Sequence, residues 1–253
     1  MVTFSADFLH NQLGGITWSP GLNYIPPNST TPSLVKNRSY YTLDAGVEPY
    51  LPKGPGEHGA KLTAFFNTNP SDIYEEAEED SFDETPLFAC ATPWATEKDQ
   101  RRYVYFGNYS QTRWSDKLDY DRMIECVPAH VKQYWAEELA AKGRPKWVTE
   151  ALMKHFWPKP VYDGAITVPA DDSDDKMMRD IKFYITELKA WEKEARLKVN
   201  LIKKEDILKA FDTADADDPP ALRLWWEYLQ CAGWDKNFYD MLVTLQARNK
   251  NYF

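Results

Sequence analysis

The chain has few cysteines and no long apolar run. Three widely spaced cysteines are too few for a disulfide framework, which predicts reduced thiols. No stretch approaches the about 18 apolar residues of a membrane-spanning helix, and the mean hydropathy is −0.61. Residues 1–13 lack a basic start followed by an apolar stretch. We therefore expect an intracellular protein, nuclear or cytoplasmic, with no membrane partner.

Signatures of catalytic and metal sites are also missing. The sequence has no G-x-S-x-G elbow, Walker loop, G-x-G-x-x-G or H-E-x-x-H motif. Cys126 and His130 are four residues apart, but Pro128 lies between them and no second ligand pair exists. We expect no catalytic residue, no metal and no cofactor. One alternative stays open, an unrecognised enzyme that uses dispersed residues such as His58 with a carboxylate.

Negative charge is concentrated in one segment. The 253 residues include 39 acids and 30 bases, which gives a net charge of −9. Eight of the acids lie between Asp72 and Glu84, where there is no base. This composition predicts an acidic insert at residues 70–85, either a solvated excursion or a docking tail. The rest of the chain is electrically balanced. The low pI of the whole protein therefore does not exclude nucleic-acid binding by that remainder.

Aromatic residues are abundant, with ten tryptophans and fifteen tyrosines. Several stand beside a basic or amide group, a combination that can stack a planar ligand and hydrogen-bond its edge. The predicted ligand-binding residues are Tyr105, Asn108, Tyr109, Arg113 and Trp114. They predict an aromatic and polar pocket, with a nucleic-acid base as the candidate ligand. The alternative is that most of these rings pack in the core.

Local patterns predict a strand-rich first part and a helical second part. Ser5 can cap a short helix that Gly14 and Gly15 end. Strands are expected at residues 39–43, 62–66, 87–91 and 102–106, the last two forming a hairpin. Helices are expected at residues 128–139, 146–156, 205–211 and 219–229, and after Asp235.

The longest predicted helix begins near Ser173. Its apolar residues recur at steps of four and three and so form one stripe, which is either core packing or a partner surface. The stripe consists of Met177, Ile181, Tyr184, Leu188, Trp191 and Ala195.

Several motifs occur in an order that resembles a known domain. They are Phe4-Ser5-x-x-Phe8-Leu9 with Gly14-Gly15, Tyr41-x-Leu43, Pro52-x-Gly54-Pro55-Gly56-x-x-Gly59, Leu87-Phe88, Tyr103-Val104-Tyr105-Phe106-Gly107-x-Tyr109, and Tyr228-Leu229-Gln230-Cys231-Ala232-Gly233-Trp234-Asp235. In this order they resemble an uncharacterised domain found at the C-terminus of proteins in mushroom-forming fungi. The acidic insert and the long charged helix depart from that pattern. The resemblance implies a shared fold, and it carries over no activity and no catalytic residue.

Together these features predict one α+β domain spanning residues 1–253. A small, barrel-like β-rich part (residues 1–115) would pack against a helical part (residues 116–253). We expect a non-enzymatic binding module whose aromatic pocket reads a nucleic-acid base. The alternative is a protein-interaction scaffold that uses the acidic insert and the long helix, so the partner would be a nucleic acid or a protein.

Overall fold

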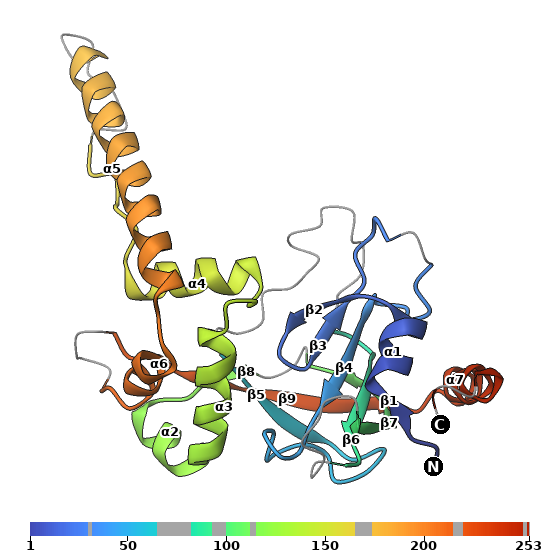
Figure 1. Cartoon of the computed structure of the whole chain (residues 1–253). Coiled ribbons are helices and arrows are strands. Elements are labelled where there is room, and N and C mark those ends of the chain that lie inside the picture. Colours follow the sequence, from blue (N-terminus) through green and yellow to red (C-terminus); the bar gives the residue numbers. More distant parts are fainter. Residues whose placement is uncertain are drawn as a thin grey trace. The chain divides into compact units, whose positions relative to one another are not determined.

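A computed structural model describes residues 1–29, 32–64, 82–92, 100–111, 115–164, 174–214 and 220–249, and Tyr252 (Figure 1). The chain forms two compact units, one made of Met1–Trp135 with Arg223–Phe253 and the other of Ala136–Leu222. The class is mixed α and β, with the sheet in the first unit. Most of the predicted acidic insert lies outside the described residues, as do Arg113 and Trp114.

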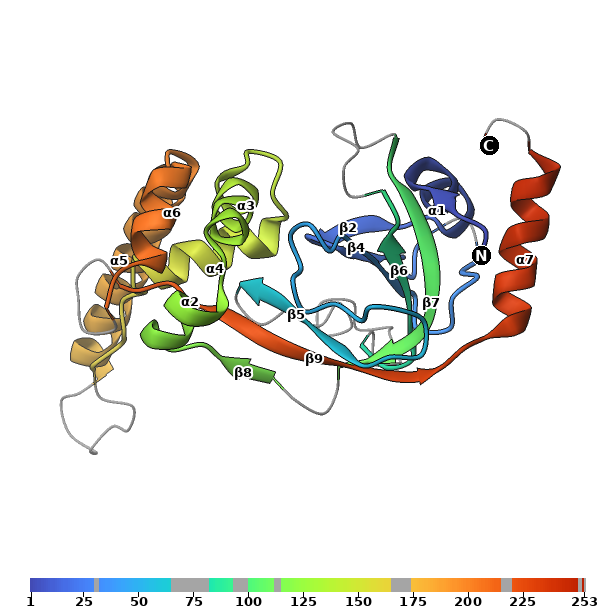
Figure 2. The same ribbon diagram turned by 90° about the horizontal axis from the view of Figure 1, so that it is seen from below.

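The first unit is built on a curled sheet, a half-barrel in the view of Figure 2. Its strands among the described residues are β1 (Phe4–Ser5), β2 (Ile16–Ser19), β3 (Leu22–Tyr24), β4 (Ser39–Leu43), β5 (Gly59–Ala64), β6 (Thr85–Cys90), β7 (Arg102–Ser110), β8 (Ser115–Lys117) and β9 (Leu224–Gly233). They follow the order β2-β3-β4-β6-β7-β9-β5, with β1 on β7 and β8 on β9. The expected strands at residues 39–43, 87–91 and 102–106 are confirmed within a few residues.

Strand β7 is longer than its sequence pattern predicts. Its side chains alternate between half-buried and buried along the whole strand, and it pairs antiparallel with β6 as the predicted hairpin. The expected end at Gly107 is wrong, because this glycine has φ +119° and lets the strand continue through an irregularity in register. Beyond it, Asn108 and Tyr109 pair with β9.

The helix predicted at residues 219–229 is wrong, because Leu224–Gly233 forms strand β9. Trp225, Trp226 and Tyr228 favour a strand, since aromatic side chains pack well on a pleated surface. The strand pairs with β5, β7 and β8. The chain after residue 223 therefore completes the sheet of the N-terminal part, and β structure is not confined to residues 1–115.

Helices α1 (Ala6–Leu13), α2 (Tyr120–Cys126) and α7 (Lys236–Arg248) belong to the first unit. The predicted cap of α1 is confirmed, since Ser5 Oγ accepts a hydrogen bond of 3.1 Å from the Phe8 amide. Asp235 Oδ1 caps α7 in the same way at Phe238. Residues of α1 and α7 share one buried core with Phe88 and Tyr105.

The remaining helices are α3 (Ala129–Ala140), which crosses the boundary between the units, and α4 (Lys146–Phe156), α5 (Asp174–Asn200) and α6 (Lys204–Phe211) of the second unit. All four confirm the predicted helices. Arg144 fixes the turn before α4, because its guanidinium donates to the carbonyl oxygens of Leu139 (3.1 Å) and Val199 (2.7 Å). In Figure 1 the N-terminal half of α5 extends beyond α4.

Candidate functional site

Three of the predicted ligand-binding residues lie on β7, which pairs antiparallel with β6 and, at Asn108 and Tyr109, with β9. The Tyr105 side chain is fully buried and its hydroxyl donates to Asn108 Oδ1 over 2.7 Å. Tyr109 is also fully buried, and its hydroxyl donates to the Glu57 carbonyl oxygen over 2.9 Å. Burial raises the pKa of both tyrosines. Their role in ligand binding stays a prediction, and Arg113 and Trp114 lie outside the described residues.

Motifs that are far apart in sequence come together where β7 pairs with β9. The Cys231 amide donates to His58 Nδ1 over 3.0 Å, which joins the glycine-rich turn to β9. The Tyr105 ring lies 5.8 Å from the ring of Trp234, whose side chain is 41% exposed. Among the described residues, no carboxylate pairs with His58.

A cluster of buried ionisable groups lies inside the same unit. Lys61 on β5 and Glu227 on β9 are direct partners in register, with Nζ 2.6 Å from Oε2 and both side chains at most 3% exposed. Glu48 accepts a hydrogen bond of 2.8 Å from the Leu62 amide. Burial raises the pKa of Glu48 to about 8, against the lowering effects of the Leu62 hydrogen bond and of Lys61.

Sequence reasoning missed this cluster, because a lysine or glutamate within a strand usually faces solvent. Clusters of this kind occur both in functional sites and in structural ion pairs. Lys61 also lies 5.9 Å from the centre of the Tyr41 ring, so an aromatic face shares in holding the buried ammonium group.

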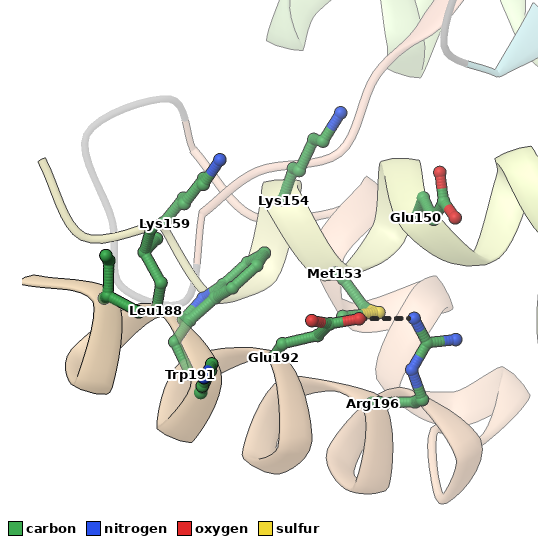
Figure 3. Close-up of a pocket in the computed structure, with 10 residues that line it drawn as sticks. Glu150, Met153, Lys154, Lys159, Leu188, Trp191, Glu192 and Arg196 are labelled. Carbon is green, nitrogen blue, oxygen red and sulfur yellow. Dashed lines mark hydrogen bonds and ion pairs between the residues drawn. The ribbon is translucent and has the colours of Figure 1, made fainter.

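A groove in the second unit lies between α4 and α5 (Figure 3). It has a volume of about 410 Å³. The residues that line it are Glu150, Met153, Lys154, Lys159, Ile185, Leu188, Lys189, Trp191, Glu192 and Arg196. Leu188 and Trp191 belong to the stripe predicted on the long helix, which therefore contributes an apolar floor. The Trp191 indole donates to the Trp157 carbonyl oxygen over 2.8 Å, which fixes the ring in place.

The charges on the groove rim are unbalanced. Glu192 pairs with Arg196 at 3.1 Å, and Glu150 pairs with Lys146 at 3.8 Å. Lys154, Lys159 and Lys189, in contrast, are exposed and make no ion pair with any residue that the structure describes. Figure 3 shows Lys154 and Lys159 on the α4 side, with both ammonium ends turned away from α5.

Three lysines therefore line the groove beside an apolar floor, and none of them has a carboxylate partner among the described residues. The pattern along α5 predicted only the stripe, because Lys154 and Lys159 come from α4 and from the chain that follows it.

Within the described ranges, no group of three or more histidine, cysteine, aspartate or glutamate residues is placed to hold a metal ion. No helix in the described part of the chain is long and apolar enough to span a membrane.

Comparison with known protein families identifies the family of this chain. The model of a domain of unknown function, DUF6697, matches residues 3–245. The match covers nearly the whole chain, so the chain belongs to the DUF6697 family. No match was found among curated proteins or among solved structures. The resemblance to an uncharacterised domain reaching both ends of the chain is confirmed, and the fungal origin stays a prediction.

Proposed function

We propose that this member of the DUF6697 family is a non-enzymatic binding module that holds an acidic peptide segment of a partner protein in the groove between α4 and α5. One observation carries the proposal. Lys154, Lys159 and Lys189 line a groove with an apolar floor and make no ion pair among the described residues. The proposal develops the scaffold alternative in which the long helix provides the docking surface.

The floor and the rim have different tasks in this proposal. A groove of about 410 Å³ has room for a few side chains. Met153 adapts to irregular apolar shapes, and Trp191 offers a large ring held in place by its own hydrogen bond. The lysines attract carboxylates and orient the peptide, which affects association rate and specificity more than raw affinity.

A nucleic-acid base fits this groove less well. Base reading needs free hydrogen-bonding groups beside an exposed ring, and the indole N–H of Trp191 already donates to Trp157. The rings of Tyr105 and Tyr109, which first suggested base reading, have no exposed surface on which a base could stack. An acidic peptide therefore agrees better with the chemistry of the groove.

Peptide binding to the full chain tests the proposal. The probe is a labelled peptide of about 15 residues in which a Leu-Trp pair is flanked by aspartates and glutamates, and fluorescence anisotropy measures its binding. The variant K154E/K159E/K189E reverses the rim charge, and we expect it to bind the peptide at least about tenfold more weakly. The matched control K53E/K142E/K193E makes the same change in net charge at exposed lysines outside the groove, and it should bind like the parent.

Two results would contradict the proposal. Equal losses in the two triple variants would show that net charge, and not the groove, attracts the peptide. Tighter binding of a single-stranded oligonucleotide of about 12 nucleotides, lost in the groove variant alone, would assign the groove to nucleic acid.

A further inference from the structure

We infer that the acidic partner of the α4–α5 groove is a second copy of this chain, which presents its own residues 70–81. The inference rests on the proposed function and names the partner. Residues 70–81 read Pro-Ser-Asp-Ile-Tyr-Glu-Glu-Ala-Glu-Glu-Asp-Ser. This stretch contains six carboxylates and no base, and its two large apolar residues, Ile73 and Tyr74, are adjacent.

The end of the acidic run is already engaged in the first unit. Phe82 is 7% exposed. Asp83 Oδ1 accepts a hydrogen bond of 2.6 Å from the Ser110 hydroxyl, and Glu84 pairs with Lys36 at 3.7 Å. These residues have partners where they are, so the carboxylates that would meet the groove are those from Asp72 to Asp80.

The composition of the segment complements the groove in two respects. The apolar pair Ile73-Tyr74 can occupy the floor formed with Trp191, where a tyrosine ring contributes apolar area and a polar tip. The carboxylates that follow can then meet Lys154, Lys159 and Lys189, which make no ion pair among the described residues. One apolar anchor beside a run of acids is the chemistry that the proposed function requires.

A second copy fits because each chain carries both halves of the contact. Two chains can each place the segment in the groove of the other, which gives two reciprocal contacts and a closed twofold arrangement. Once the first contact forms, the second is intramolecular and benefits from a high effective concentration. Two individually weak contacts can therefore hold a dimer.

The first experiment uses the segment as a probe. A labelled peptide of residues 70–81 is titrated with the full chain at low salt, because salt screens exposed charges. We expect saturable binding, a loss of at least about tenfold in K154E/K159E/K189E and no loss in K53E/K142E/K193E. Two altered peptides, one with Ile73 and Tyr74 replaced by serine and one with all six acids replaced by their amides, should each bind at least about tenfold more weakly.

The second experiment measures the assembly state of the full chain by analytical ultracentrifugation over a concentration series. The parent should pass from monomer to dimer. The groove variant should remain monomeric, as should a chain whose six acids between Asp72 and Asp80 are replaced by asparagine and glutamine. Circular dichroism checks that each variant is folded.

The outcomes separate this inference from the proposed function. If the parent is monomeric at every concentration, or if the dimer persists in the groove variant, the second copy is not the partner. The inference also fails if the designed acidic peptide binds and the peptide of residues 70–81 does not, and in these cases the proposed function can still hold. If neither peptide binds, both are wrong.

Discussion

At the scale of single residues, Gly107 decides how closely β7 can approach β9. It has φ +119°, a conformation that side-chain-bearing residues rarely adopt. A Cβ atom at this position would lie 2.5 Å from the carbonyl oxygen of Gly233. The glycine thus lets β7 approach β9 closely and places Asn108 opposite Gly233.

The substitution G107A should destabilise the protein by at least about 2 kcal/mol, because it adds backbone strain and a contact between Cβ and a backbone oxygen. Urea unfolding followed by circular dichroism measures the change. G54A is the control, since its Cβ would meet no atom within 4 Å. A loss of stability no larger than that of G54A would mean that the contact between β7 and β9 adjusts to the added Cβ atom at little cost.

Single aromatic residues also account for much of the unusual composition. The Tyr105 ring lies 5.5 Å from the rings of both Phe88 and Phe238, and Phe4 stacks on Phe8 at 5.4 Å. Aromatic pairs at these separations add stability beyond the area that they bury. Tyr105, one of the rings that suggested a ligand pocket, therefore belongs to the core of the first unit.

At the scale of elements, β9 pairs with three other strands of the first unit, β5, β7 and β8. Six residue pairs link it antiparallel to β5, from Gly59–Leu229 to Ala64–Leu224. Within this ladder, Lys61 and Glu227 bring a buried ion pair into the sheet. Removing one partner would leave the other charge buried without its ion pair, which is far more costly than removing both.

The pair of strands therefore allows a double-mutant test. E227L should lower the free energy of unfolding by about 3–5 kcal/mol, because Lys61 loses its partner. The double variant K61M/E227L should be much closer to the parent, since apolar side chains of similar size fill the same space. Urea unfolding of both variants measures the difference. A double variant as unstable as E227L would contradict the explanation.

Helix α5 serves two purposes with one stripe. Ala195 and Val199 are buried within the second unit, while Leu188 and Trp191 are half-buried and line the groove. The stripe predicted as either core packing or a partner surface thus contributes buried core near the C-terminal end of the helix, and the proposed partner surface lies just before it.

At the scale of the whole molecule, the termini of the first unit are held together. Arg102 donates to the carbonyl oxygens of Thr3 (2.7 Å) and Tyr252 (3.0 Å). Gln246 on α7 also donates to the Thr3 carbonyl oxygen, over 3.2 Å. Thr3 and Tyr252, near the two ends of the chain, are therefore held by the same unit, and the helical unit is inserted between Trp135 and Arg223.

Stability should depend on pH through Glu48. Its pKa is about 8 in the folded protein against an ordinary value of 4.5. As the pH rises from 4.5, the unfolded chain releases this proton and the folded chain keeps it, so the free energy of unfolding falls until about pH 8. The loss should be of the order of a few kcal/mol, at about 1.4 kcal/mol per unit of pKa difference.

The variant E48Q has no carboxyl group to titrate at this position, so its stability should depend less on pH between 5 and 8. Urea unfolding at a series of pH values compares E48Q with the parent and with E57Q, which alters an exposed carboxylate. A slope as steep in E48Q as in the parent would show that Glu48 is not the group responsible.

Local signals in the sequence determined many elements. Ser5 as a cap and Gly14 at φ +75° delimit α1, and the residues of α4 agree with the prediction at both ends. Neighbours in sequence set these features through capping, backbone freedom and side-chain periodicity, so a single stretch contains the necessary information. The aromatic and β-branched residues at positions 102–106 likewise predicted a strand before any partner was known.

The tertiary structure decided what depends on distant partners. Residues 224–233 are a strand because β5, β7 and β8 pair with them, although part of this stretch was predicted as helix. Only strand register buries Lys61 against Glu227, and only the packing of α4 on α5 brings Lys154 and Trp191 to one groove. Such contacts join residues whose separation in sequence is large, and local propensity contains no information about them.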